Sequence, residues 1–171
     1  MVMIAGLVAA GTETTTIGGT RGIRTLLHPE EMEKLRSDPS LIPNAVDELL
    51  RFDFGPLGIS RYALRDFELR GKKIRKGQLL LLNFLAAHRD PEAFPDPDRF
   101  DISRDTSRLT IFGHGPHHCL GANVARTELA SMFEAVLDIL PPGARLLENE
   151  IEWQCMGMFS SIKSLPVDCG N

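Results

Sequence analysis

One ten-residue segment concentrates side chains that could hold a metal. Residues 112–121 contain an aromatic start, three glycines, three histidines and one cysteine. The thiolate of Cys119 would be a good soft ligand for iron, and the glycines allow a flat, bulky group to lie close to the backbone. His117, two residues before Cys119, could donate a hydrogen bond to an anionic part of that group. The pattern therefore favours a metal macrocycle over a bare ion.

The residues after this segment predict a helix that would position the cysteine. Apolar residues recur at the spacing of one helical face: Ala125, Leu129, Met132, Phe133, Val136, Leu137 and Leu140. Two prolines and a glycine at 141–143 end the pattern. Because a helix start offers unpaired N–H groups and the positive end of the helix dipole, a cysteine just before it lies where an anion is favoured.

Two other interpretations of the cysteine segment stay open. A lone cysteine before a helix is often a small buried hydrophobic residue. His114, His117, His118 and Cys119 could also bind zinc, although a closed zinc site commonly uses two spaced pairs of ligands. The four residues here lie within one turn, and the sequence has no CxxC pair elsewhere.

The order of residue types in 112–121 resembles the haem-binding signature of the cytochrome P-450 family, in its soluble bacterial form. The matching residues are Phe112, Gly113, Gly115, His117, Cys119 and Gly121. The resemblance implies that Cys119 is the proximal thiolate ligand of haem b (iron protoporphyrin IX), that it tunes O₂ chemistry, and that His117 holds a propionate. It also implies a mainly α fold with a small β-sheet (α+β), the C-terminal portion of the family's fold, with residues 1–171 as a single haem-binding region.

The first residues predict a second functional helix. Residues 1–16 form an apolar pattern, which predicts a buried helix. Residues 10–15 are similar to the family's distal-helix signature, in which Thr14 and Glu13 would deliver protons to oxygen. The alternative is a structural helix whose threonines hydrogen-bond back to the preceding turn. Three glycines within 18–22 then predict a frayed or kinked helix end.

Two further groups would support the site. Glu48 and Arg51 are spaced three apart on a predicted helix over 44–52. In the family such a pair is buried and locks to a later arginine, here expected to be Arg99. Arg61, expected at the start of a strand, matches a residue that pairs with a haem propionate, as a guanidinium fork suits a carboxylate. The alternative for Arg61 is a solvated residue at a strand end.

Short strands and turns predict a small sheet between residues 61 and 87, packed on the helices. Four leucines at 79–82 indicate a buried strand followed by a short helix. His88, in the loop after it, is expected to anchor that loop. A hairpin is expected over 148–167, with residues 156–159 at its tip lining the substrate site or belonging to the core. Residues 54–58 are expected to line the substrate pocket as well.

Composition limits the possible functions. The chain has 171 residues, enough for one domain, and its net charge of −4 argues against nucleic acid as a main partner. Three cysteines fit a reducing cytoplasm better than a disulfide framework, and no uncharged run is long enough to span a bilayer.

The resemblance covers nearly the whole chain but only part of the family's fold. It implies a monooxygenase that inserts one oxygen atom of O₂ into a small organic substrate, with a ferredoxin and its reductase as electron donors. The alternative is a truncated, non-catalytic remnant or interaction module that cannot enclose haem on its own.

Overall fold

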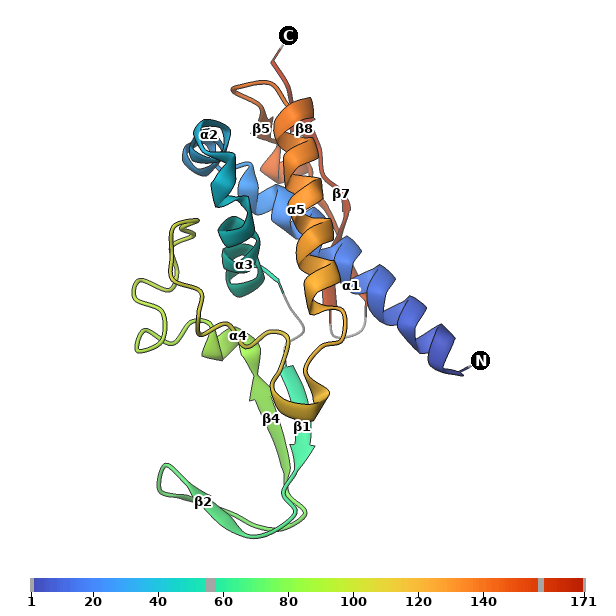
Figure 1. Ribbon diagram of the computed structural model, residues 1–171, viewed down its shortest axis with the longest axis vertical. Coiled ribbons are helices and arrows are strands. Elements are labelled where there is room, and N and C mark those ends of the chain that lie inside the picture. The colour runs from blue at the N-terminus through green and yellow to red at the C-terminus, as the bar shows by residue number, and fades with distance from the viewer. Residues whose placement is uncertain (1, 55–57, 157–158, 171) are drawn as a thin grey trace.

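The helices gather in one group, and strands extend from it at both ends (Figure 1). The computed structural model describes residues 2–54, 58–156 and 159–170. The α-helices are α1 (Val2–Leu26), α2 (Pro29–Ser37), α3 (Ile42–Phe52), α4 (Phe84–Ala87) and α5 (Ala122–Ile139), with 3-10 turns at Pro39–Leu41, Gly115–His117 and Glu148–Glu150. The strands are β1 (Gly58–Tyr62), β2 (Phe67–Leu69), β3 (Lys72–Ile74), β4 (Leu79–Asn83), β5 (Arg145–Leu146), β6 (Glu152–Met156), β7 (Phe159–Ser164) and β8 (Val167–Asp168). The predicted class, mainly α with small β-sheets, is confirmed.

Helix α5 lies at the centre, where the periodic apolar pattern predicted a helix. Its Leu129 and Phe133 are buried, and the helix ends at Ile139, shortly before the two prolines. Helix α3 packs against α5 through a fully buried face that includes Leu49. These apolar faces pack against one another in a single buried cluster. None of the helices within the described residues is long and apolar enough to cross a bilayer.

Helix α1 is one continuous helix, so the predicted frayed or kinked end is wrong. Gly18, Gly19 and Gly22 lie where α1 packs against α3 and α5. A Cβ at Gly22 would lie 2.5 Å from Leu49 Cδ2 and 2.9 Å from Phe133 Cε1, and one at Gly18 would meet Phe54 at 3.2 Å. The missing side chains therefore allow close helix contact, which outweighs the low helix propensity of glycine.

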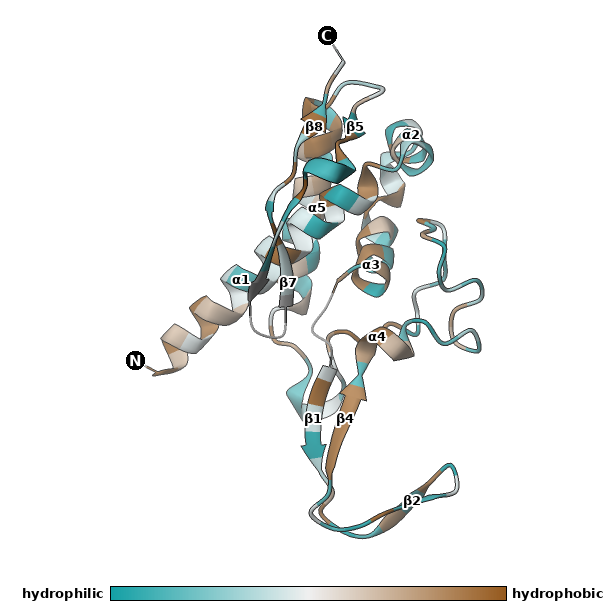
Figure 2. Cartoon of the chain, turned by 180° about the vertical axis from the view of Figure 1, so that it is seen from behind, coloured by the Kyte–Doolittle hydropathy of each residue, from teal (hydrophilic) through white to brown (hydrophobic). Residues whose placement is uncertain are grey.

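The first half of α1 projects from the helix group, and its apolar residues are exposed (Figure 2). Ile4 is 65% exposed and Leu7 53% exposed. The prediction that residues 1–16 are buried is therefore wrong for this chain. An apolar pattern indicates a surface that can be buried, but it does not supply the neighbours that would cover it.

The strands form two-stranded antiparallel sheets in the described residues. Strand β1 pairs with β4 and β2 with β3, and this arm points away from the helices (Figure 1). The leucines of β4 form the predicted strand, but Leu79 and Leu81 are 60% and 63% exposed, so the predicted burial and packing on the helices are wrong. The short helix expected after β4 is α4, capped by the Asn83 side chain.

The C-terminal hairpin is confirmed: β6 pairs with β7, and β5 pairs with β8. Strand β7 lies along α1, where the Arg21 guanidinium donates to the Ser160 carbonyl at 3.0 Å. The expected substrate-lining residues 157–158 at the tip lie outside the described residues, as do 55–57 of the expected pocket segment.

Candidate functional site

The cysteine loop, residues 112–121, runs beneath the N-terminal end of α5 (Figure 1). Gly113 and Gly115 have φ angles of +74° and +76°, in the region that favours glycine. The Cys119 amide donates across the loop to the Phe112 carbonyl at 2.9 Å. The Cys119 carbonyl accepts from Ala122 N at 3.3 Å, which joins the loop to the helix. The sequence therefore places the cysteine directly ahead of α5, as predicted.

Cys119 itself is exposed, and so is every residue from His114 to Leu120. The interpretation as a small buried hydrophobic residue is therefore wrong. The zinc alternative lacks support as well, because no three His, Cys, Asp or Glu side chains of the described residues are grouped to hold a metal ion. In the described part of the chain, the Cys119 thiol therefore lies on an exposed loop and is not grouped with other metal-ligating side chains.

This donor set fits a haem. A single exposed thiol offers one soft axial ligand, which leaves the rest of the iron's coordination to a macrocycle. The imidazole of His117 is exposed on the same loop. A Cβ at Gly115 or Gly121 would meet no atom within 4 Å, so the loop's glycines leave open space beside the backbone.

Arg61 lies on β1, near the end of the strand and not at its start. Its Nη1 donates to the neighbouring Ser60 carbonyl at 2.9 Å, and its side chain is exposed. No carboxylate of the described residues pairs with it. The guanidinium is thus available for an external carboxylate, and the solvated strand-end alternative describes its present surroundings equally well.

Thr14 and Glu13 lie in the projecting half of α1. The Thr14 hydroxyl donates to the Ala10 carbonyl at 2.6 Å, and Thr12 and Thr16 make the same contact one turn back. This is the back-bonded arrangement of the structural alternative. The hydroxyl oxygen nevertheless keeps its lone pairs, so Thr14 can still accept a hydrogen bond. Glu13 is exposed.

A buried ion cluster holds the segment before the cysteine loop. Arg51 is fully buried and donates to both oxygens of Glu48, at 2.7 and 2.9 Å. The other arginine in this cluster is Arg104, whose Nε lies 3.1 Å from Glu48 Oε1. The prediction of Arg99 is wrong: its side chain is 60% exposed beside Asp101, and only its carbonyl accepts from Arg51.

His88 connects this cluster to Thr110, two residues before the cysteine loop, which confirms its anchoring role. Its carbonyl accepts from Arg51 at 2.8 Å, and its Nε2 accepts from the Thr110 amide at 3.2 Å. The side chain is buried between the rings of Phe84 and Phe94. Burial, together with the positive charges of Arg51 and Arg89, lowers the pKa of His88 to about 4. The ring is therefore neutral at neutral pH, as an acceptor must be.

Sequence reasoning missed the role of Arg126, one turn into α5. Its guanidinium lies over the Phe112 ring, with Cζ 4.6 Å from the ring centroid, and its Nε donates to Asp47 of α3 at 2.7 Å. Its position on the polar side of the predicted helix gave no signal of a contact. Phe112 lies against Arg126 only because the cysteine loop folds back toward α5.

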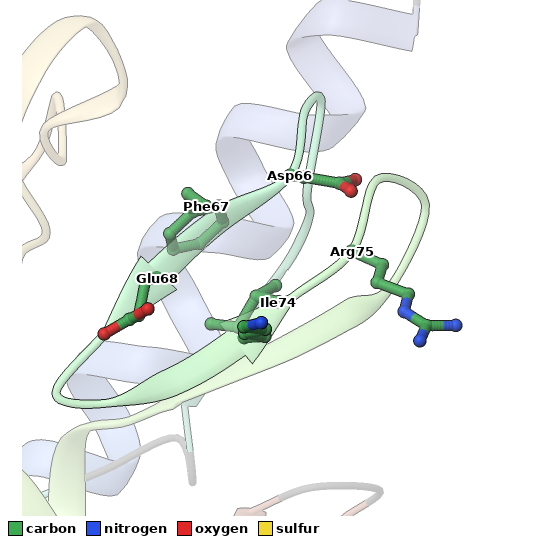
Figure 3. Close-up of a pocket in the computed structure, with 6 residues that line it drawn as sticks. Asp66, Phe67, Glu68, Ile74 and Arg75 are labelled. Carbon is green, nitrogen blue, oxygen red and sulfur yellow. The ribbon is translucent and has the colours of Figure 1, made fainter.

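A notch of about 290 Å³ lies elsewhere, on the β2–β3 hairpin (Figure 3). It is lined by Asp66, Phe67, Glu68, Lys73, Ile74 and Arg75. The side chains of Glu68 and Arg75 point away from one another in Figure 3. None of the candidate site residues lines this notch, so it is not the site assembled around Cys119.

Comparison with known proteins supports the family resemblance of the cysteine loop. The family model described as cytochrome P-450 matches residues 1–139. The chain is 42% identical over 163 residues to the cytochrome P-450 CYP107DY1 of Priestia megaterium, covering 94% of this chain and 40% of that protein. It is 42% identical over 169 residues to mycinamicin IV hydroxylase/epoxidase of Micromonospora griseorubida, covering 95% and 42%.

A solved structure gives the same result. The LnmA cytochrome P-450 hydroxylase of Streptomyces atroolivaceus superposes with a TM-score of 0.85 at 41% identity, covering 95% of this chain and 43% of that one. The chain thus spans about two fifths of the length of the relatives it matches. With a single exposed cysteine on the glycine-bent loop before α5, and with relatives along most of its length, the chain belongs to the cytochrome P-450 family.

Proposed function

We propose that this chain forms the haem-binding part of a bacterial monooxygenase, with Cys119 as the proximal ligand of a haem b iron. The observation that carries the proposal is the exposed Cys119 on a loop fixed by the hydrogen bond from its own amide to Phe112, in a chain of the cytochrome P-450 family. When bound, the haem would supply the activation of O₂, with one oxygen atom going to a small organic substrate and the other to water.

The loop's own residues would present the sulfur and orient the cofactor. Gly113 turns the backbone so that Phe112 and Cys119 face each other across the loop, and Gly121 leads into α5. The helix N-terminus favours the anionic sulfur. His117 and Arg61, both exposed, would donate to the two haem carboxylates, since neither side chain is in an ion pair within the described chain.

On α1, Thr14 and Glu13 would manage protons. The Thr14 hydroxyl donates to Ala10, so it would act as an acceptor that holds a water or a hydroxyl in place. The exposed Glu13 carboxylate would take up protons from solvent and pass them inward. Replacing Thr14 by alanine should then raise the electrons consumed per product formed, and unchanged coupling would remove Thr14 from this role.

Partners and location follow from the same proposal. Electrons would come from a ferredoxin with its reductase. The few cysteines favour a reducing compartment, so we place the protein in the cytoplasm. The second candidate is a non-catalytic remnant or interaction module, favoured by the apolar residues of α1 and β4, which no other part of the described chain covers.

One spectrum separates the two candidates. We would load the 171-residue chain with haem, reduce it, add carbon monoxide and record the difference spectrum. Cys119→Ala removes the proposed ligand, and Cys169→Ala is the matched control, because Cys169 is also a free, exposed cysteine. The wild type and the control should give the red-shifted Soret band of a haem thiolate, and Cys119→Ala should not. A band that survives Cys119→Ala would overturn the proposal, and its absence from the wild type would favour the remnant.

A further inference from the structure

We propose that Arg126 is a positioning residue for Cys119 and acts through the ring of Phe112; this rests on the proposed role of Cys119. Arg126 makes two contacts at once. Its guanidinium carbon lies 4.6 Å from the centroid of the Phe112 ring. Its Nε donates to Oδ1 of Asp47 at 2.7 Å. A cation over an aromatic face is attracted to the ring, and the planar guanidinium can stack there while its edge holds a carboxylate.

Phe112 links the Arg126 contact to Cys119, because the same residue carries the ring that Arg126 covers and the carbonyl that binds the Cys119 amide. Its carbonyl accepts the amide hydrogen of Cys119 at 2.9 Å, across a loop that contains two glycines with positive φ. The glycines make this loop easy to deform. Because the ring and the carbonyl belong to one residue, fixing the Phe112 ring limits the directions in which the carbonyl can hold Cys119.

Asp47 fixes the position of the Arg126 guanidinium over the Phe112 ring, and we call the Asp47–Arg126 pair the clamp. It lies on α3, next to Glu48 of the buried ion cluster, and its side chain is 25% exposed against 36% for Arg126. No other acceptor within the described residues takes a hydrogen bond from Arg126. The carboxylate therefore holds the guanidinium edge while its face covers Phe112. A lysine would keep the positive charge but could not stack and pair at the same time.

The link therefore runs from α3 through Arg126 and Phe112 to the sulfur-bearing residue. It is separate from the His88 contact, which ties down the earlier residue Thr110. Positioning of this kind matters because the residues around a side chain that would hold a metal fix its orientation. Loss of the clamp should let the loop open more often without unfolding the helices.

Hydrogen exchange of the haem-free chain tests this directly. The variants are Arg126→Met, Arg126→Lys and Asp47→Asn. The matched control is Arg36→Met, because Arg36 also binds α5, but at its other end, through the carbonyls of Leu137 and Leu140. The amide of Cys119 should exchange about fivefold faster in Arg126→Met, the scale of one lost cation–π contact. The control should leave that amide unchanged.

A second readout uses the haem-loaded, reduced chain with carbon monoxide. The fraction of haem with the red-shifted thiolate band should fall in Arg126→Met and Asp47→Asn, and stay at the wild-type value in Arg36→Met. Should Arg126→Met unfold the chain, Arg126→Lys answers the same question: faster exchange at Cys119 alone supports the clamp. Wild-type exchange at Cys119 in the lysine and asparagine variants would overturn it. A wild type without the thiolate band would instead refute the proposed function, since the exchange result stands apart from haem.

Discussion

At the scale of the residue, Glu48 concentrates the interactions that hold the segment before the cysteine loop. Its buried carboxylate accepts from Arg51, from Arg104 and from the backbone amide of Asp101 at 3.0 Å. A carboxylate with several charged donors in a dry interior cannot be removed without leaving those donors unpaired. The cluster thus supports the segment that leads into the cysteine loop.

Glu48→Gln should lower the free energy of unfolding by about 3–5 kcal/mol, because Arg51 would remain buried without its countercharge. Arg104→Met should also be costly, since that side chain is only 9% exposed. Arg99→Met is the control and should cost less than about 1 kcal/mol, as its ion pair with Asp101 is exposed. Urea unfolding followed by far-UV circular dichroism measures all three. Equal losses at Arg99 and Arg104 would contradict the assignment of Arg104 to the cluster.

His88 should make stability depend on pH. Its folded pKa of about 4 lies below the ordinary value of 6.5, so the unfolded chain binds more protons between those values. The stabilising contribution is complete above about pH 6.5 and is lost as the pH falls toward about 4. His88→Gln keeps an acceptor for the Thr110 amide without the titration. It should be less stable than the wild type near pH 7.5, with a smaller difference near pH 5. Urea midpoints at the two values test this, and a constant difference would contradict it.

The residues that sequence could identify were those within ordered motifs. Cys119 and the Glu48–Arg51 pair stand at fixed spacings, and the structure puts the cysteine on its loop and the pair in the interior. Arg104 could not be told from Arg99, because both follow a proline-rich stretch with no periodic backbone to orient them. In such a segment the direction of each side chain is set by tertiary contacts alone.

At the scale of the element, periodicity predicted the existence of helices well and their environment poorly. Helix α5 was predicted with its buried face, because its sequence has an apolar side and a polar side at helical spacing. Helix α1 and strand β4 were predicted as elements, but their burial was wrong. Burial depends on what packs against an element, and no local pattern contains that information. The prediction for Gly18, Gly19 and Gly22 of α1 was wrong for the same reason. These glycines make room for side chains of other elements, such as Leu49 of α3 and Phe133 of α5.

The stability effects of alanine at two glycines of α1, one in contact with other helices and one exposed, can be compared directly. Gly22→Ala should lower the free energy of unfolding by roughly 1–3 kcal/mol, because the new methyl would overlap side chains of both Leu49 and Phe133. Gly6→Ala, on the exposed half of the same helix, meets nothing within 4 Å and should raise stability by about 0.5–1 kcal/mol through helix propensity. Thermal unfolding compares the two. A stabilising Gly22→Ala would mean that α1 does not approach the other helices as closely as described.

At the scale of the whole molecule, the chain exposes apolar residues on two projections, the first half of α1 and the arm of β1 and β4 (Figure 2). Its relatives are more than twice as long, so they have additional chain with which to bury surface. In the 171-residue chain these residues face water, and large exposed apolar patches favour association.

We therefore expect the haem-free chain to self-associate, and α1 to contribute to it. Ile4 and Val8 lie one turn apart on α1 and are 65% and 62% exposed. The double variant Ile4→Lys/Val8→Lys should lower the average mass in sedimentation velocity. The melting temperature should hardly change, since substitutions at such exposed sites typically alter stability by no more than about 0.5 kcal/mol. Thr12→Lys, one turn further along and already polar, is the control and should associate like the wild type. If the double variant associates as strongly as the control, Ile4 and Val8 have no part in the contact surface, and the prediction for α1 is wrong.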